Sequence, residues 1–134
     1  MPPMLEPYGA TVVAYLVLGL FLLAQALVAD AAAIRSGHVP GTPVGGGHDD
    51  FLFRAARAHA NTNESLGAFL VLSLAAIFLG AGAWWTNVLA SGFVASRAGH
   101  MLAYYLDLRA ARSASFAAGF GCLIGLLVVG AAAL

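Results

Sequence analysis

The chain has 134 residues, of which 61% are hydrophobic and 9% are charged, and its mean hydropathy is +0.88. This composition is too apolar for an ordinary soluble domain and predicts a protein that is embedded in a membrane. Six arginines balance six acidic residues and there is no lysine, so the chain lacks the excess of positive charge that nucleic-acid binding requires.

Three stretches of the sequence contain no charged residue: residues 7–29, 65–96 and 113–134. They are 23, 32 and 22 residues long, and a helix needs about 20 residues to cross a bilayer. The middle stretch is longer than one helix and is interrupted by Gly80 and Gly82, so it predicts the ends of two helices joined by a hairpin. We therefore expect an all-α fold, an integral membrane four-helix bundle formed by a single domain over residues 1–134.

The expected helices cover residues 8–34, 50–79, 84–108 and 112–133, and a polar loop rich in glycine and proline covers residues 36–50. Five of the six arginines fall at the end of the bundle that holds this loop and the connection between the third and fourth helices. These are Arg35, Arg54, Arg57, Arg109 and Arg112. By the positive-inside rule, this end of a multi-pass protein faces the cytoplasm.

Polar side chains repeat every three or four residues along the second and third helices, a spacing that keeps them on one face of each helix. The stripes comprise Arg54, Arg57, Asn61 and Glu64 on the second helix and Arg97, His100, Tyr104 and Asp107 on the third. Arg97 lies roughly 15 Å from the cytoplasmic end of its helix, near the bilayer midplane. A charge at that depth costs a few kcal/mol unless it is paired, so the stripes predict either a ligand site or an internal ion pair between Arg97 and Glu64.

The residue types in these stripes suit a zwitterion with more than one carboxylate. Arginine pairs bidentately with carboxylates, and Glu64 accepts hydrogen bonds from an ammonium group. No metal site is expected, because His59 and His100 have no further histidine or cysteine at ligand spacing and the neighbouring arginines disfavour a cation. His38 and His48 are expected to be solvated residues of the loop.

Three motifs resemble the MAPEG family, the membrane-associated proteins in eicosanoid and glutathione metabolism. They are R-x-x-R-A-H-x-N-x-x-E at the start of the second helix, R-x-x-H-x-x-x-Y in the third, and Arg112 with Ser113 at the start of the fourth. The resemblance covers nearly the whole chain and is to bacterial-type members similar to microsomal glutathione transferase and prostaglandin E synthase. It implies a homotrimer in the bacterial inner membrane, with glutathione bound in the cytoplasmic half between adjacent subunits and a lipophilic co-substrate entering from the bilayer.

The resemblance also implies roles for individual residues. Arg112 faces the glutathione thiol and Ser113 places a hydroxyl beside it, although Arg109 is a rival for the first role because the interval after Tyr104 departs from the family pattern. Arg57 holds a carboxylate, and Arg35 adds a carboxylate contact from the neighbouring subunit. The full set of implied glutathione-binding residues is Arg35, Arg57, Asn61, Glu64, Arg97, His100 and Tyr104.

These roles predict an enzyme that activates glutathione. A thiol with a pKa of about 8.5 is only a few per cent ionised at neutral pH, and lowering that pKa by about two units stabilises the thiolate by roughly 2.7 kcal/mol. We therefore expect a glutathione-dependent transferase or peroxidase that acts on lipophilic electrophiles or lipid hydroperoxides. The alternative is a non-catalytic lipid-binding scaffold, as in the lipoxygenase-activating branch of the family. A small four-helix exporter is disfavoured, since the middle of the first helix lacks a carboxylate.

Overall fold

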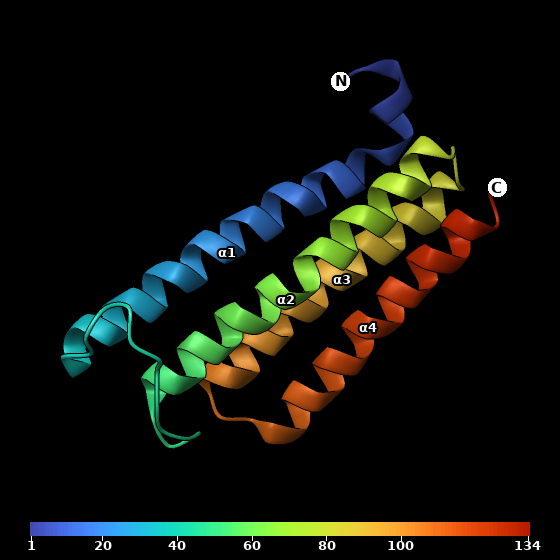
Figure 1. Ribbon diagram of the computed structural model, residues 1–134. Coiled ribbons are helices and arrows are strands. Elements are labelled where there is room, and N and C mark those ends of the chain that lie inside the picture. The colour runs from blue at the N-terminus through green and yellow to red at the C-terminus, as the bar shows by residue number, and fades with distance from the viewer.

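The apolar stretches of the sequence form four long helices in the computed structural model, which describes residues 1–134. A short 3-10 helix, η1 (Pro3–Tyr8), leads into α1 (Gly9–Ser36), which is followed by α2 (Phe51–Phe78), α3 (Ala83–Tyr105) and α4 (Arg109–Ala131). The helices run alternately in opposite directions, so both termini and the α2–α3 hairpin lie at one end of the bundle and the α1–α2 and α3–α4 connections lie at the other (Figure 1). The expected all-α, four-helix architecture is confirmed.

The largest difference from the expected helix boundaries lies between α3 and α4. The helix α3 ends at Tyr105, and Asp107 then adopts a left-handed backbone conformation with φ of 52°. The next helix begins at Arg109, three residues earlier than expected, because Ala110 and Ala111 extend it toward its N-terminus. The backbone N–H of Arg112 therefore donates to the carbonyl of Leu108 (3.0 Å), and it is not one of the free N–H groups at the helix start.

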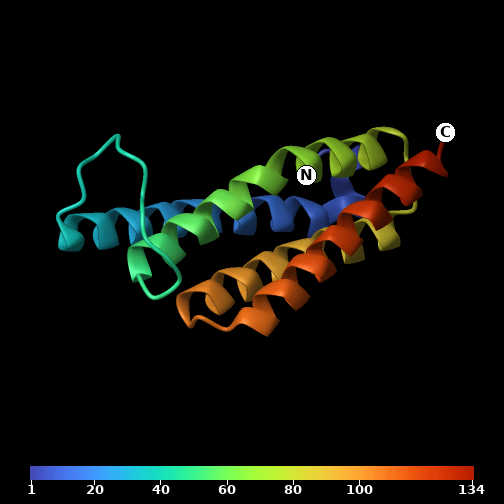
Figure 2. The ribbon, with the colours of Figure 1, turned by 60° about the horizontal axis from the view of Figure 1, so that its bottom comes forward.

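Three helical segments are long and apolar enough to cross a membrane: Pro3–Ser36, Phe51–Phe78 and Arg109–Ala131. The helix α3 falls outside this group although it has 23 residues, since its sequence includes polar and charged side chains. Those side chains point into the bundle, where Arg97 is 2% and His100 is 4% exposed. The helix runs beside α4 along most of its length (Figure 2) and also packs against α1 and α2.

The hydrophobic core contains side chains from all four long helices and includes two stacked rings. Phe69 of α2 lies against Phe93 of α3 with a centroid distance of 4.4 Å, and Tyr15 of α1 meets Phe69 edge-on at 5.5 Å. The Tyr15 hydroxyl donates to the hydroxyl of Ser73 (2.8 Å). Long apolar side chains such as Leu16 and Leu23 are exposed along α1, as expected for a surface that faces lipid or another subunit.

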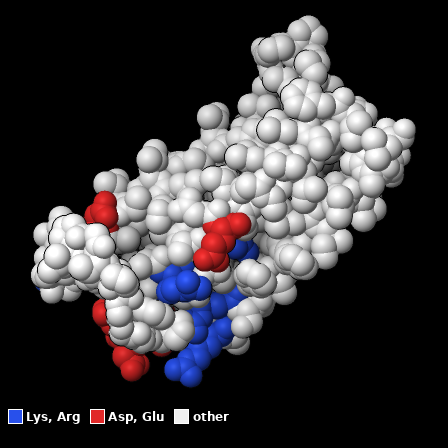
Figure 3. Space-filling model, in the orientation of Figure 1, with Lys and Arg blue, Asp and Glu red and all other residues white.

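All charged side chains except Glu6, which lies in η1, are in the half of the molecule away from the termini. On the face shown in Figure 3 they lie over the half that contains the α1–α2 and α3–α4 connections, and the half toward the termini shows none. The fold therefore brings the arginines of α2 and α4 to a common end of the bundle, and it buries Arg97 of α3 farther inside.

Candidate functional site

A pocket of about 320 Å³ opens at the charged end of the bundle, between α2, α3, α4 and the segment that precedes α2. We call it the mouth pocket. It is lined by His48, Arg57, Asn61, His100, Tyr104, Arg112, Ser113 and Phe116. Six of these eight residues were singled out in the sequence, so the two polar stripes and the start of α4 meet in one place.

The guanidinium of Arg112 is held in the mouth pocket by three neighbours. It lies over the ring of Tyr104 at 4.8 Å, forms an ion pair with Asp107 at 3.5 Å, and donates to Nδ1 of His48 at 2.6 Å. Because a guanidinium only donates hydrogen bonds, Nδ1 of His48 must be the acceptor and carries no proton. The expectation that His48 is merely a solvated loop residue is therefore wrong: its ring is half-buried and orients Arg112.

The imidazole of His100 connects α3 to α4. Its Nδ1 lies 3.0 Å from the backbone carbonyl of Arg112, and since a carbonyl only accepts, Nδ1 carries the proton of this hydrogen bond. The other nitrogen, Nε2, is buried and has no partner in the protein. The ring also meets Tyr104 edge-on at 5.0 Å. His100 thus lines the mouth pocket and fixes α3 against α4 by its Nδ1 hydrogen bond, while its Nε2 is buried without a partner.

The second helix supplies Arg57 and Asn61 to the same pocket. The Asn61 amide donates to the backbone carbonyl of Arg57 (3.0 Å) and lies 3.5 Å from the Tyr104 hydroxyl. The Arg57 side chain is exposed and forms neither a hydrogen bond nor an ion pair within the chain. Its guanidinium and the carbonyl oxygen of the Asn61 side chain are therefore both free to bind a ligand.

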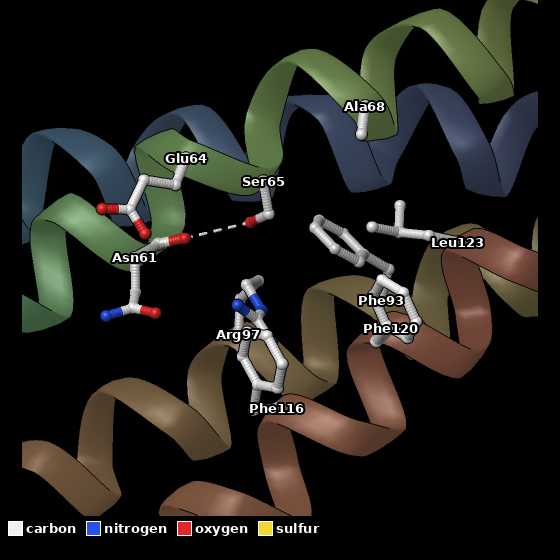
Figure 4. A pocket seen from close by; sticks show the side chains of 9 residues that line it. All are labelled: Asn61, Glu64, Ser65, Ala68, Phe93, Arg97, Phe116, Phe120 and Leu123. Carbon is white, nitrogen blue, oxygen red and sulfur yellow. Dashed lines mark hydrogen bonds between the residues drawn. The ribbon is translucent and has the colours of Figure 1, made fainter.

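A second cavity, of about 260 Å³, lies next to the mouth pocket and shares Asn61 and Phe116 with it. We call it the inner cavity (Figure 4). Its lining comprises Asn61, Glu64, Ser65, Ala68, Phe93, Arg97, Phe116, Phe120 and Leu123. Glu64 and Arg97, which were expected in one pocket with His100 and Tyr104, are thus separated from these two residues by the shared wall.

No ion pair joins Arg97 to Glu64, which was one of the two arrangements expected for these residues. The only ion pair in the chain is that of Arg112 with Asp107. Glu64 is exposed and extends toward the start of α2, away from the guanidinium (Figure 4). Arg97 instead lies between two aromatic rings, 5.4 Å from Phe93 and 5.8 Å from Phe116.

Three arginines line neither cavity: Arg54, which donates to the backbone carbonyl of His48, and Arg109 and Arg35. Arg109 is exposed at the first position of α4, and it lines neither cavity. Arg35 is exposed near the end of α1, beside Asp50 and Phe51, on a separate part of the surface. Within one chain, the arginine that reaches the mouth pocket from α4 is therefore Arg112.

Comparison with known proteins supplies one match. A family model described as the MAPEG family matches residues 9–132, nearly the whole chain. No curated protein matches the chain. The matched region contains all four long helices and every residue of the two cavities.

Proposed function

The chain belongs to the MAPEG family and is an integral membrane protein, and we propose that it is an enzyme that binds glutathione in the mouth pocket and ionises its thiol. One observation carries the proposal. Side chains of three helices converge on a single pocket of about 320 Å³ at the charged end of the bundle, with guanidinium, amide, imidazole and hydroxyl groups along its wall. A volume of this size is typical of small-molecule sites.

Glutathione carries two carboxylates, an ammonium group, two amides and a thiol, and the free groups of the site complement them. The exposed guanidinium of Arg57 suits a carboxylate. The side-chain carbonyl of Asn61 suits an amide N–H group, since it is an acceptor without a partner in the chain. Glu64 suits the ammonium group; it is exposed one helical turn from Asn61 and lines the inner cavity, so this end of glutathione extends past Asn61 out of the mouth pocket.

The thiol is assigned to the neighbourhood of Arg112 and Ser113. The guanidinium is oriented by Tyr104, His48 and Asp107, so it stabilises an anion without first reorganising. The hydroxyl of Ser113 contacts the carbonyl of Arg109 at 3.4 Å, a weak bond that it can exchange for one to the sulfur. When the thiol loses its proton to water at the pocket mouth, the thiolate becomes the nucleophile.

The reaction that follows is conjugation to a lipophilic electrophile or reduction of a lipid hydroperoxide. In conjugation the thiolate sulfur forms a bond to carbon and displaces a leaving group. In reduction it attacks a peroxide oxygen and breaks the O–O bond, which gives glutathione sulfenic acid and an alkoxide that takes up a proton. A second glutathione thiol then attacks the sulfenic sulfur, so that a disulfide forms and water leaves. Both substrates partition into the bilayer and approach through the apolar side of the bundle.

The proposal extends to orientation and assembly. The protein lies in the inner membrane of a bacterial cell, and its mouth pocket faces the cytoplasm. The clustering of arginines at that end supports this orientation. The assembly is a homotrimer in which Arg35 reaches the mouth pocket of a neighbouring subunit. The position of Arg35, at the same end of the bundle but outside the pocket of its own chain, supports this role.

A second candidate function is a non-catalytic lipid-binding scaffold. The inner cavity favours it, because five of the nine residues that line this cavity are hydrophobic and several of them are exposed on the side of the bundle. The two functions differ in one property: only the enzyme ionises the glutathione thiol.

The deciding experiment is a titration of the detergent-purified protein with glutathione, followed by thiolate absorbance. Arg112→Ala is expected to retain most glutathione affinity and to lose the thiolate signal, since the guanidinium acts on the thiol and the other groups hold the rest of the molecule. Arg109→Ala, which removes an exposed arginine three residues away and outside the pocket, is the matched control and is expected to behave as the unmodified protein. Absence of binding in the unmodified protein would refute the enzyme and favour the scaffold.

A further inference from the structure

The ionisation of a thiol needs an acceptor for its proton, and the mouth pocket contains a side chain suited to that task. His48 lines the pocket with a half-buried imidazole. Its Nδ1 accepts a hydrogen bond from Nη1 of Arg112 at 2.6 Å, so the neutral ring carries its proton on Nε2 and presents an unprotonated nitrogen beside the guanidinium. Imidazole is the commonest general base in proteins, because its ordinary pKa of about 6.5 is close to neutral pH.

The ring of His48 is held in the pocket by its neighbours. It meets the ring of Phe53 edge-on at 5.3 Å, and its centroid lies 6.1 Å from that of Tyr104. The backbone carbonyl of His48 accepts a hydrogen bond from the side chain of Arg54, which fixes the end of the loop against α2. A base that is fixed in this way is already in position when the thiol arrives.

A thiol that lies at Arg112 is within reach of the same imidazole. Nη1 of Arg112 and Nδ1 of His48 are one hydrogen bond apart and belong to the wall of one pocket. A sulfur that accepts from Nη1 therefore takes the place of Nδ1 at the guanidinium, and the displaced Nδ1 remains next to it. This arrangement brings the proton donor and the proton acceptor together without any movement of a helix.

The other titratable groups of the pocket are less suited to take the proton. The carboxylate of Asp107 is paired with Arg112 at 3.5 Å, and its protonation would give up that pair. His100 uses Nδ1 to donate to the backbone carbonyl of Arg112, and its Nε2 is buried. A guanidinium and a phenol both hold their protons at neutral pH, so Arg57 and Tyr104 do not act as bases.

From this arrangement we propose that His48 is the general base that takes the proton of the glutathione thiol before it reaches the water at the pocket mouth, an inference that rests on the proposed function. The S–H bond breaks as an N–H bond forms at Nδ1, and no group is oxidised or reduced in this step. Protonated Nδ1 no longer accepts from Arg112, so the thiolate sulfur replaces it and accepts from both groups. After the sulfur has reacted, the imidazolium gives its proton to water or to the alkoxide formed from a peroxide.

The charges in the pocket favour this transfer. Asp107 already offsets the charge of Arg112, so a thiolate at this guanidinium is only partly compensated. When the proton stays on His48, an imidazolium lies beside the thiolate and the net charge of the pocket does not change. Loss of the proton to water would instead leave an additional negative charge in the pocket.

The test is a count of the protons that glutathione binding releases. Glutathione is titrated into the detergent-purified protein by calorimetry in buffers of different ionisation enthalpy, at a pH of about 7.5, where the free thiol and free imidazole are both largely neutral. Thiolate absorbance is recorded in parallel, and S-methylglutathione, which has no thiol proton, gives the proton exchange of all other groups. We expect the unmodified protein to form the thiolate and to release no more protons with glutathione than with the S-methyl analogue. Release of about one additional proton for each thiolate would overturn the proposal.

His48→Asn separates the base from the hydrogen-bond acceptor. The amide oxygen of asparagine can accept from Arg112 in place of Nδ1, but it does not take up a proton at neutral pH. We expect this variant to keep the thiolate signal and to release about one proton for each thiolate. A variant that forms the thiolate and still releases no proton would show that another group holds it. His38→Asn, in the same loop but outside both cavities, is the matched control and is expected to behave as the unmodified protein.

The substitution leaves the attachment of the loop intact, because Arg54 donates to the backbone of His48 and the side chain of Asp50 accepts from the N–H of Leu52 at 2.9 Å. The two proposals also fail in different ways. Absence of a thiolate signal in the unmodified protein would refute the glutathione enzyme itself. A thiolate signal that is accompanied by proton release would refute only the role of His48.

Discussion

Replacement of Gly119 by alanine tests whether the guanidinium of Arg97 is packed against the backbone of α4. The new Cβ atom would lie 2.5 Å from Oγ of Ser96 and 2.6 Å from Nη2 of Arg97, where ordinary contacts begin at 3.4 Å. Both groups must move. The hydroxyl of Ser96 can turn away only if it gives up its hydrogen bond to the Phe93 carbonyl, and the guanidinium can move only if it leaves the rings of Phe93 and Phe116.

The size of the effect follows from these losses. One hydrogen bond contributes about 1 kcal/mol, and the cation–π contacts of a desolvated guanidinium contribute about 1 to 2 kcal/mol. Alanine gains up to about 1 kcal/mol over glycine in the interior of a helix. We therefore expect Gly119→Ala to lower the free energy of unfolding by about 1 to 2 kcal/mol, within the range of other substitutions that overpack a well-filled interior.

Gly121 provides the matched control for this prediction. It lies two residues farther along α4, and an added Cβ atom would meet nothing within 4 Å. Gly121→Ala is thus expected to leave the stability unchanged or to raise it by up to about 1 kcal/mol. The assay is thermal or dodecyl sulfate unfolding of the purified protein, followed by circular dichroism. A Gly119→Ala variant as stable as Gly121→Ala would show that the guanidinium of Arg97 does not pack against α4 at Gly119.

Three further predictions concern other parts of the molecule. Tyr104→Phe is expected to keep the thiolate signal of bound glutathione, because the ring under Arg112 remains, whereas Tyr104→Leu removes the 4.8 Å contact and is expected to weaken the signal; equal signals would show that the ring does not orient the guanidinium. Gln25 is fully buried and both polar atoms of its side chain lack partners, so Gln25→Met is expected to stabilise the protein by about 1 to 3 kcal/mol in an unfolding assay, and a loss of stability would contradict this. In a Cys122→Ser background, Thr42→Cys is expected to react with an impermeant thiol reagent in inverted membrane vesicles and not in intact cells; the opposite pattern would reverse the proposed orientation.

Much of the fold could be predicted from the sequence because two simple patterns determine it, the length of the charge-free stretches and the spacing of the polar residues. Charge-free stretches of sufficient length predict the helices, and the three-and-four spacing of Arg57, Asn61, His100 and Tyr104 predicts which faces turn inward. Polar side chains cost free energy when they face lipid, so they are placed against other polar side chains inside the bundle. This cost explains why the two stripes meet in one pocket.

The contribution of His48 could not be predicted in this way. It lies in a segment with three consecutive glycines, Gly45 to Gly47, where no periodicity restricts the direction of a side chain. Its position depends on Arg112, 64 residues away in the sequence, and on the ring of Phe53, which it meets edge-on at 5.3 Å. Spacing identifies neighbours on one helix, but it does not identify a partner that a loop delivers.

The start of α4 was predicted three residues too late, at Arg112 instead of Arg109, for a different reason. Ala110 and Ala111 favour a helix and carry no capping side chain, so the sequence does not mark the boundary, and Asp107 ends α3 in a left-handed conformation that asparagine and aspartate adopt more readily than most residues. The shift of three residues changes how the site works. Because the N–H of Arg112 is used within the helix, its contribution to anion binding comes from the guanidinium rather than from the helix N-terminus.

The relation between Arg97 and Glu64 shows what periodicity leaves undetermined and why it matters for function. Their helical positions allow an ion pair, yet α4 contributes Phe116 and the space above Gly119, and these give the guanidinium a different place to lie. Arg97 is therefore not neutralised within the chain, and its guanidinium lies in a cavity that shares the side chains of Asn61 and Phe116 with the mouth pocket. A spacing rule that considers one pair of helices omits the third helix, and here the third helix decides where the charge lies.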